Sequence, residues 1–344
     1  MRRWPLLLLG PLVSLVALIL ILRRLDVADL HDAMRGVNLV WLVLILPVYL
    51  CAHLIRGMRW QLMLYPVKRV RWRVTTSIIL VGMMANNFLP ARLGELVRAL
   101  ALRRQEQLGT AFGLTSIAAE RIFDGMALLV IFCVTALVTR FPPRLHGTLV
   151  AVGWTAAAVF LLAFTLILVA RLFPRFIGAV VSRVTALLPR RWRGSAEQLW
   201  PSALGALAFL RPDRTLVLFV LLTLAIWLIE GAVLLLGTQA FGLELDLRLA
   251  YFTLVLVGFS VAVPSAPGYF GVFEAGVVLA FAAFGIAREV ALSYAIVVHA
   301  IHFSFIAVAG LISLHALGMT FGSLRQMTRN ARSERKADRI PDGA

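Results

Sequence analysis

Long runs of apolar residues, separated by short polar segments rich in arginine, dominate the chain. Six of these runs have the length that a helix needs to cross the roughly 30 Å hydrocarbon core of a bilayer. Their approximate limits are 5–22, 39–55, 110–139, 148–170, 215–240 and 290–317. The strands of a membrane barrel would instead alternate apolar and polar residues. The pattern therefore predicts an all-α, polytopic helical membrane protein with about six full crossings.

Two further apolar stretches, at 74–102 and 249–286, are each interrupted by polar and helix-breaking residues. The interruptions are Asn86–Glu95 and Pro264–Gly271. Non-helical backbone at membrane depth is tolerated only where protein or a water-filled cavity surrounds it. Each stretch is therefore predicted to form a re-entrant hairpin of two half-helices that enters and leaves on one side. A simple kink is the alternative, because Pro and Gly are frequent in transmembrane helices.

The two interrupted stretches belong to a weak internal repeat. One constant offset places Pro90 on Pro267 and Gly94 on Gly271. Each unit reads span, broken hairpin, span, and the two units are predicted to begin on opposite sides of the membrane. Inverted repeats with broken helices are an architecture of transporters, whose substrate site lies where the units meet. The predicted units are 39–139 and 215–317, within a single transmembrane domain of residues 1–320.

Composition and charge narrow the class further. Apolar types make up 61% of the 344 residues and charged types 15%, against about 45–50% and 25% in soluble domains. A soluble enzyme, a disordered protein and a secreted disulfide domain are therefore excluded. The net charge of +17 comes almost entirely from arginines at the ends of apolar runs. That placement is typical of topogenic charge near anionic lipid, and we expect no nucleic-acid partner.

The basic residues concentrate in segments that share one side of the membrane with the N-terminus. This asymmetry predicts cytoplasmic N- and C-termini in a bacterial inner membrane, and it assigns Arg56 and Arg59 to a cytoplasmic segment. The segments concerned are 56–73, 103–109, 171–214 and the basic tail 321–344, which is predicted to be disordered.

The segment 171–200 mixes arginines with apolar residues that recur at spacings of three and four. This spacing predicts an amphipathic helix lying on the cytoplasmic lipid surface. For its second half, a basic linker is the alternative.

Charged residues at membrane depth gather around the first interruption and in the apolar run that follows it. They are Arg92, Glu95, Arg98, Glu120, Arg121 and Asp124. A charge at the centre of a membrane helix costs about 2.5–3.5 kcal/mol on insertion scales, so these groups must pair, face water or bind a ligand. The spacing places the first three on one helix face. It also places Glu120 and Asp124 on one face, with Arg121 able to reach Asp124.

The first interruption also has the features of an anion site. Pro90 is expected at the start of a half-helix, where its missing N–H costs nothing. The free N–H groups of that first turn, with Arg92, would attract an anion such as a lipid phosphate. The alternative is a charge cluster that only locks two helices together.

The second repeat unit carries fewer charges, Glu230 and Glu274, and neither has an evident cation nearby in the sequence. A buried carboxylate without a partner tends to take up a proton, which suggests proton coupling or the acceptance of a cationic head group. A protonated carboxyl that hydrogen-bonds to a neighbouring helix is the alternative. His299 and His302 are expected to pack or hydrogen-bond, and no metal or other cofactor is expected.

Three segments resemble a known family. Asn87-Phe88-Leu89-Pro90-Ala91-Arg92-Leu93-Gly94-Glu95-Leu96-Val97-Arg98 is similar to the N-x-x-P-x-R-x-G-E-x-x-R segment in the flippase-like membrane domain of bacterial lysylphosphatidylglycerol synthases. Glu120-Arg121-Ile122-Phe123-Asp124 resembles that family's E-R-x-x-D helix. Pro267–Glu274 resembles its P-G-G-x-G-x-x-E segment, with Tyr269 where a second glycine is usual. The resemblance covers about 5–320 and implies a translocase that moves a lipid between leaflets.

The resemblance does not extend to synthase activity, because the segment after the last span is too short for an aminoacyl-transferring domain. Stand-alone members are similar to proteins associated with polyprenyl-phosphate, glycolipid or hopanoid pathways. We therefore expect a non-enzymatic translocase of a lipid or lipid-linked intermediate, with Arg92 and Arg98 holding a head-group phosphate. An intramembrane enzyme and an accessory scaffold for lipid-synthesis enzymes are the alternatives. The expected substrate-binding residues are Asn87, Pro90, Arg92, Gly94, Glu95, Arg98, Glu120, Arg121, Asp124, Glu230, Pro267, Gly268, Gly271 and Glu274.

Overall fold

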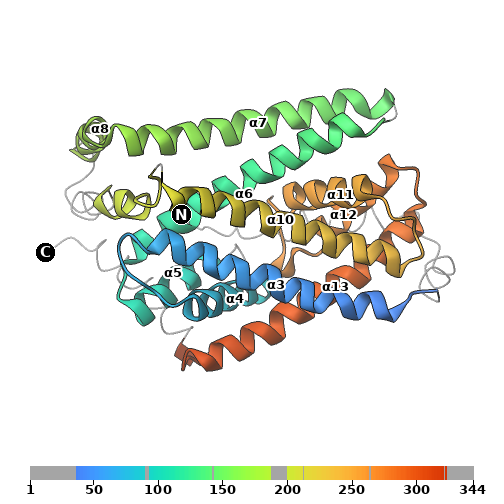
Figure 1. Ribbon diagram of the computed structural model, residues 1–344, viewed down its shortest axis with the longest axis horizontal. Coiled ribbons are helices and arrows are strands. Elements are labelled where there is room, and N and C mark those ends of the chain that lie inside the picture. The colour runs from blue at the N-terminus through green and yellow to red at the C-terminus, as the bar shows by residue number, and fades with distance from the viewer. Residues whose placement is uncertain are drawn as a thin grey trace, which may run out of the picture.

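The computed structural model describes residues 36–89, 93–141, 143–186, 200–211, 213–262, 265–320 and 322–323. Within these ranges every regular element is a helix (Figure 1), which confirms the predicted all-α class. The predicted crossing at 5–22 lies outside the described residues, as do Pro90, Arg92 and most of the tail.

Five long helices form the body of the molecule. They are α3 (Leu39–Leu64), α6 (Thr110–Val138), α7 (Pro143–Leu172), α10 (Arg214–Ala240) and α13 (Arg288–Ala316). All five are long and apolar enough to cross a membrane. Each exceeds the roughly 20 residues that span the hydrocarbon core. They coincide with five of the six predicted crossings, although α3 continues well past the predicted end at residue 55.

Two pairs of shorter helices interrupt this pattern. The first pair is α4 (Trp72–Phe88) and α5 (Leu93–Glu106), and the second is α11 (Leu247–Ser260) and α12 (Val272–Ala283). A short 3₁₀ turn, η2 (Pro267–Tyr269), lies inside the second break. The helices have 12 to 17 residues, about 18–26 Å at 1.5 Å per residue. None of them alone reaches across the hydrocarbon core.

The chain reverses direction at both breaks. Gly94 N–H donates to Asn86 Oδ1 at 2.8 Å, and one turn further from the break Gly82 lies directly against the Arg98 side chain. In the second pair, Gly276 lies against the backbone of Val257. In each pair, residues at increasing distances before and after the break contact each other, as in a helical hairpin. A kinked single helix would not bring these residues together, so the simple-kink alternative is wrong. That the hairpins enter and leave on one side of the membrane stays a prediction.

The order long, short, short, long occurs twice, in α3–α6 and in α10–α13 with η2. The two long helices that open the units, α3 and α10, pack side by side (Figure 1). The packing of α4 on α13 has its counterpart in α11 on α6, as a two-fold relation between the units would give. Their inverted orientation in a membrane stays a prediction.

Both breaks converge on the middle of α13. Asn87 Nδ2 donates to the Phe303 carbonyl at 3.3 Å. The rings of Phe88 and Phe270, one from each break, lie 5.6 and 5.7 Å from the Phe303 ring. Residues almost two hundred positions apart in the sequence therefore meet at one point, as expected where two repeat units join.

α7 lies at the edge of the molecule, packed mainly along α6, and leads into α8 (Pro174–Ala186). In Figure 1, α8 is seen nearly end-on beside the end of α7, so its axis turns sharply away from α7. Phe176, Val180 and Val184 recur at helical spacing along α8 and are exposed. A helix is thus present at Pro174–Ala186, its position on the cytoplasmic lipid surface stays a prediction, and 187–199 lies outside the described residues.

Candidate functional site

Two carboxylates of α6 form the centre of a buried ion network. Glu120 and Asp124 are one turn apart, and only 2% and 3% of their surfaces are exposed. Both point from α6 toward α3, α5 and α10, which confirms that they share one helix face. Burial of two carboxylates at this depth requires cationic partners.

Arg59 of α3 is the first partner and is fully buried. Its guanidinium donates to Asp124 Oδ1 at 2.5 Å and forms an ion pair with Glu120 Oε1 at 3.1 Å. Asp124 Oδ1 also accepts the Trp227 indole N–H at 3.1 Å, and Arg59 donates to Thr223 Oγ1 at 3.2 Å. The site therefore joins α3, α6 and α10, helices that are distant in the sequence.

Arg98 of α5 is the second partner. It forms a two-pronged pair with Glu120, at 2.8 Å to Oε2 and 3.3 Å to Oε1, a geometry that suits the planar guanidinium. Its other side lies over the Trp60 ring, with the guanidinium carbon 4.2 Å from the centroid. The close approach of α5 depends on Gly82 and Gly94, because a Cβ on Gly94 would lie 2.0 Å from the Gly82 carbonyl oxygen.

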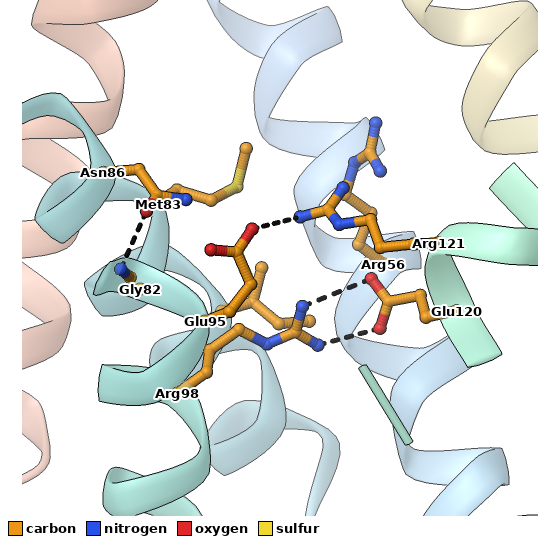
Figure 2. Close-up of a pocket in the computed structure, with 10 residues that line it drawn as sticks. Arg56, Gly82, Met83, Asn86, Glu95, Arg98, Glu120 and Arg121 are labelled. Atoms are coloured by element: carbon orange, nitrogen blue, oxygen red, sulfur yellow. Dashed lines mark hydrogen bonds and ion pairs between the residues drawn. The ribbon is translucent and has the colours of Figure 1, made fainter. Parts of the chain in front are cut away.

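The outer part of the network is looser and opens into a small cavity (Figure 2). Arg121 lies 3.6 Å from Glu95 and 3.9 Å from Asp124, and its side chain is 49% exposed. Glu95 Oε2 is buried and has no hydrogen-bond partner within the described part of the chain. The cavity has a volume of about 20 Å³, room for one water molecule but not for a phosphate. Arg56, Glu95, Arg98, Glu120 and Arg121 are the charged residues that line it.

One expectation about the first break needs correction. The N–H groups of the first turn of α5 were predicted to be free for an anion. The Gly94 N–H instead donates to Asn86 Oδ1, so this donor is already occupied by the neighbouring helix. Asn87 donates to the Phe303 carbonyl of α13 and does not line the cavity of the ion network.

Glu230 of α10 has a cationic partner, contrary to expectation. Arg56 of α3 donates to Glu230 Oε1 at 3.0 Å and lies over the Trp227 ring at 5.3 Å. The pairing joins residues 174 positions apart, which no local pattern could indicate.

Glu274 also has a partner, at the second break. Its Oε1 lies 2.6 Å from His299 Nδ1, and its Oε2 accepts the Gly271 N–H at 2.6 Å. His299 Nε2 lies 2.8 Å from the Gly268 carbonyl oxygen. The prediction that His299 forms hydrogen bonds is confirmed, whereas the prediction that Glu274 has no partner is wrong. Pro267 opens the η2 turn between these contacts.

Arg56 and Arg59 do not lie in a segment between spans, as the apolar pattern had predicted, and the side of the membrane to which they are closest stays a prediction. α3 continues to Leu64, so both side chains lie within the helix and are buried. A signal was available in the sequence, because apolar residues continue at Met58, Trp60 and 62–64 beyond the two arginines.

Counting the described residues, four arginines face four carboxylates across these helices, so the network is neutral when all are ionised. The cations are Arg56, Arg59, Arg98 and Arg121, and the anions are Glu95, Glu120, Asp124 and Glu230. Among the described residues, no group of three or more His, Cys, Asp or Glu side chains is arranged to hold a metal ion.

The helices and this site define a multi-pass membrane protein whose paired charges lie between its candidate spans. The chain belongs to the family of the lysylphosphatidylglycerol synthase TM region, whose model matches residues 7–310. It is also similar to a UPF0104 membrane protein of Methanothermobacter thermautotrophicus, with 22% identity over 317 residues, covering 89% of this chain and 93% of the relative. No solved structure matches the chain.

Proposed function

We propose that the protein moves a lipid or lipid-linked intermediate with a phosphate-bearing head group between the leaflets of a bacterial inner membrane. The head group would bind at the first break, against the outer part of the ion network. The observation that carries this proposal is Arg121, a half-exposed cation with two long ion pairs, beside a cavity lined by further buried arginines.

The inner and outer pairs of the network differ in what they can do. Arg59 and Arg98 are held at 2.5–3.3 Å by Glu120 and Asp124, and releasing either would leave a buried charge uncompensated. Arg121 is held at 3.6 and 3.9 Å and is partly solvated. It can exchange a carboxylate for a phosphate at little cost, since the guanidinium binds both in the same forked geometry.

The small cavity implies that the described conformation is closed. A phosphate needs more room than about one water molecule, so Glu95 and Arg121 would have to separate on binding. Glu95 is suited to this movement because one of its oxygens has no partner among the described residues. Arg92, three residues before Glu95, stays a predicted phosphate ligand on the basis of the sequence.

The family supports the same proposal, since its name refers to the membrane region of an enzyme that acts on a phosphate-bearing lipid. We propose a transport role without catalysis. Membrane lipids, and enzymes that make them, are the partners we propose.

The test uses purified protein in liposomes with fluorescent lipids whose exposure in each leaflet is followed by quenching from outside. Phosphatidylglycerol is compared with a neutral glycolipid that lacks phosphate. The variant is Arg121→Gln, and the matched control is Arg248→Gln, which removes an arginine of similar exposure (53%) from an ion pair with Asp246.

The proposal expects exchange of phosphatidylglycerol, loss of that exchange in Arg121→Gln, and normal exchange in Arg248→Gln. Equal exchange by Arg121→Gln and wild type would refute the site. Lipids extracted from the same liposomes are then analysed for chemical change, because an altered lipid would support the intramembrane enzyme instead.

A further inference from the structure

The second break is closed by a histidine–carboxylate contact that the ion network does not include. His299 of α13 reaches across to Gly268 in η2, and Glu274 of α12 lies between His299 and Gly271. His299 and Glu274 are 3% and 5% exposed. The His299 ring also contacts the rings of Phe273 and Phe270, whose centroids are 4.4 and 5.0 Å away.

The hydrogen-bond partners fix how many protons this contact holds. The Gly268 carbonyl oxygen can only accept, so His299 Nε2 must carry a hydrogen and donate it. In a neutral imidazole, Nδ1 then has only a lone pair. Glu274 Oε1 lies 2.6 Å from that nitrogen, and two lone pairs at this distance would repel each other. A second proton must therefore lie between Nδ1 and Oε1.

We infer that Glu274 and His299 form a proton-binding site whose shared proton holds the second break closed, and that loss of this proton opens it. With the proton present, the pair is neutral, whether written as imidazolium and carboxylate or as imidazole and carboxylic acid. Without it, the neutral ring has one hydrogen for two acceptors, so either the Nδ1–Oε1 contact or the Nε2–Gly268 contact must separate. His299 holds Gly268 and Glu274 holds Gly271, so loss of either contact breaks the chain of hydrogen bonds that ties the η2 turn to α13.

The backbone of the break is suited to move when released. Gly268, Tyr269 and Gly271 all have positive φ values, of 71°, 62° and 84°. Tyr269 is the one non-glycine residue among them, and a side chain is disfavoured in that region. The restraints from His299 and Glu274 therefore act on a turn whose conformation needs support from its surroundings.

Other titratable or charged groups lie on the helices packed around this site, and the experiment must distinguish their titration from that of His299 and Glu274. The buried groups are His302 of α13, Tyr49 and His53 of α3, and Glu230 of α10, and the η2 turn adds Tyr269. The centroids of the Tyr49 and His302 rings are 5.1 Å apart. Arg73 of α4 lies over the Trp72 ring. On α11, Arg248 pairs with Asp246, and the Tyr251 hydroxyl donates to the Leu228 carbonyl. The ion network contributes Glu120, Arg121 and Asp124 of α6.

The decisive variant is Glu274→Gln. It can keep the three hydrogen bonds of the site, but it has no carboxylate to share a titratable proton with His299. The glutamine amide can donate to His299 Nδ1 and its oxygen can accept from Gly271 N–H, while a neutral His299 still donates to Gly268. The matched control is Glu244→Gln, at an exposed carboxylate in the loop between α10 and α11.

The measurement is hydrogen–deuterium exchange of the peptide covering 266–276, in detergent, over a range of pH and corrected for the intrinsic rate. The closed state holds one proton more than the open state, so raising the pH favours opening. Above the transition the opening constant should rise about tenfold per pH unit. Wild type and Glu244→Gln should show this rise, and Glu274→Gln should show protection that does not depend on pH.

Two results would overturn the inference. One is a wild-type break whose corrected exchange does not change with pH, a result that needs no variant to fold. The other is a pH response that persists in Glu274→Gln, which would assign it to His53, His302 or another neighbour. Neither readout involves lipid movement, so failure here and failure of the proposed transport function can be told apart.

Discussion

Glu120 is the residue on which the ion network depends most, and replacing it with glutamine tests that view. Its Oε1 interacts with Arg59 at 3.1 Å and Arg98 at 3.3 Å, and its Oε2 with Arg98 at 2.8 Å. A glutamine that keeps its oxygen in the Oε1 position preserves two of these contacts. Its amide then faces an Arg98 N–H, so two donors oppose each other where an ion pair was.

The expected cost follows from burial. Two unit charges about 4 Å apart interact by about 4 kcal/mol at the effective dielectric constant that suits protein sites. Asp124 still neutralises Arg59 in the variant, whereas Arg98 is left without a full partner at 3% exposure. Leaving one buried charge uncompensated costs about 3–5 kcal/mol. We therefore expect Glu120→Gln to lower the free energy of unfolding by about that amount.

The assay is equilibrium unfolding in mixed micelles, followed by tryptophan fluorescence. The control is Glu106→Gln, whose ion pair with Lys68 has the same 2.8 Å length but is partly exposed, at 42% for Lys68. A solvated pair is worth about 0–1 kcal/mol. The difference between the two variants thus measures what burial and the second arginine add to an ion pair of equal length.

A double variant completes the test. Adding Arg98→Met to Glu120→Gln removes the unpaired charge and leaves Arg59 with Asp124, so the double variant should be about 2 kcal/mol more stable than the sum of the single changes predicts. Glu120→Gln and Glu106→Gln with equal costs, or additive single changes, would refute the reasoning.

Three further predictions concern other parts of the fold. Gly94→Ala should destabilise the protein by about 3 kcal/mol, because its Cβ would overlap a backbone oxygen of α4, whereas Gly109→Ala has open space; thermal unfolding compares them. Arg56→Met should be less stable than Arg56→Met combined with Glu230→Gln, since the single change leaves a carboxylate unpaired; a double variant as unstable as the single one would contradict this. Phe176→Asp should weaken the binding of an isolated α8 peptide to anionic vesicles, because it removes an exposed apolar side chain from the helix. Unchanged partition of the peptide into vesicles would refute the surface role of α8.

The sequence by itself determined the class of the protein and the positions of its helices. Apolar runs of membrane length and the Pro- and Gly-containing interruptions are local features, and each acts where it stands in the chain. For that reason five predicted spans, both breaks and the helix at Pro174–Ala186 agree with the structure. The shared face of Glu120 and Asp124 followed from helical spacing in the same way.

Only the tertiary structure decided which charges pair. Arg59 lies 65 positions from Asp124, and Arg56 lies 174 positions from Glu230, so each pair exists only because separate helices pack together. The spacing of charges along one helix specifies a face but not what that face meets. The same holds for Glu274, which has no cation near it in the sequence yet meets His299 because the second break folds against α13. Long-range packing, which depends on the whole set of helices at once, therefore turned isolated charges into a neutral network.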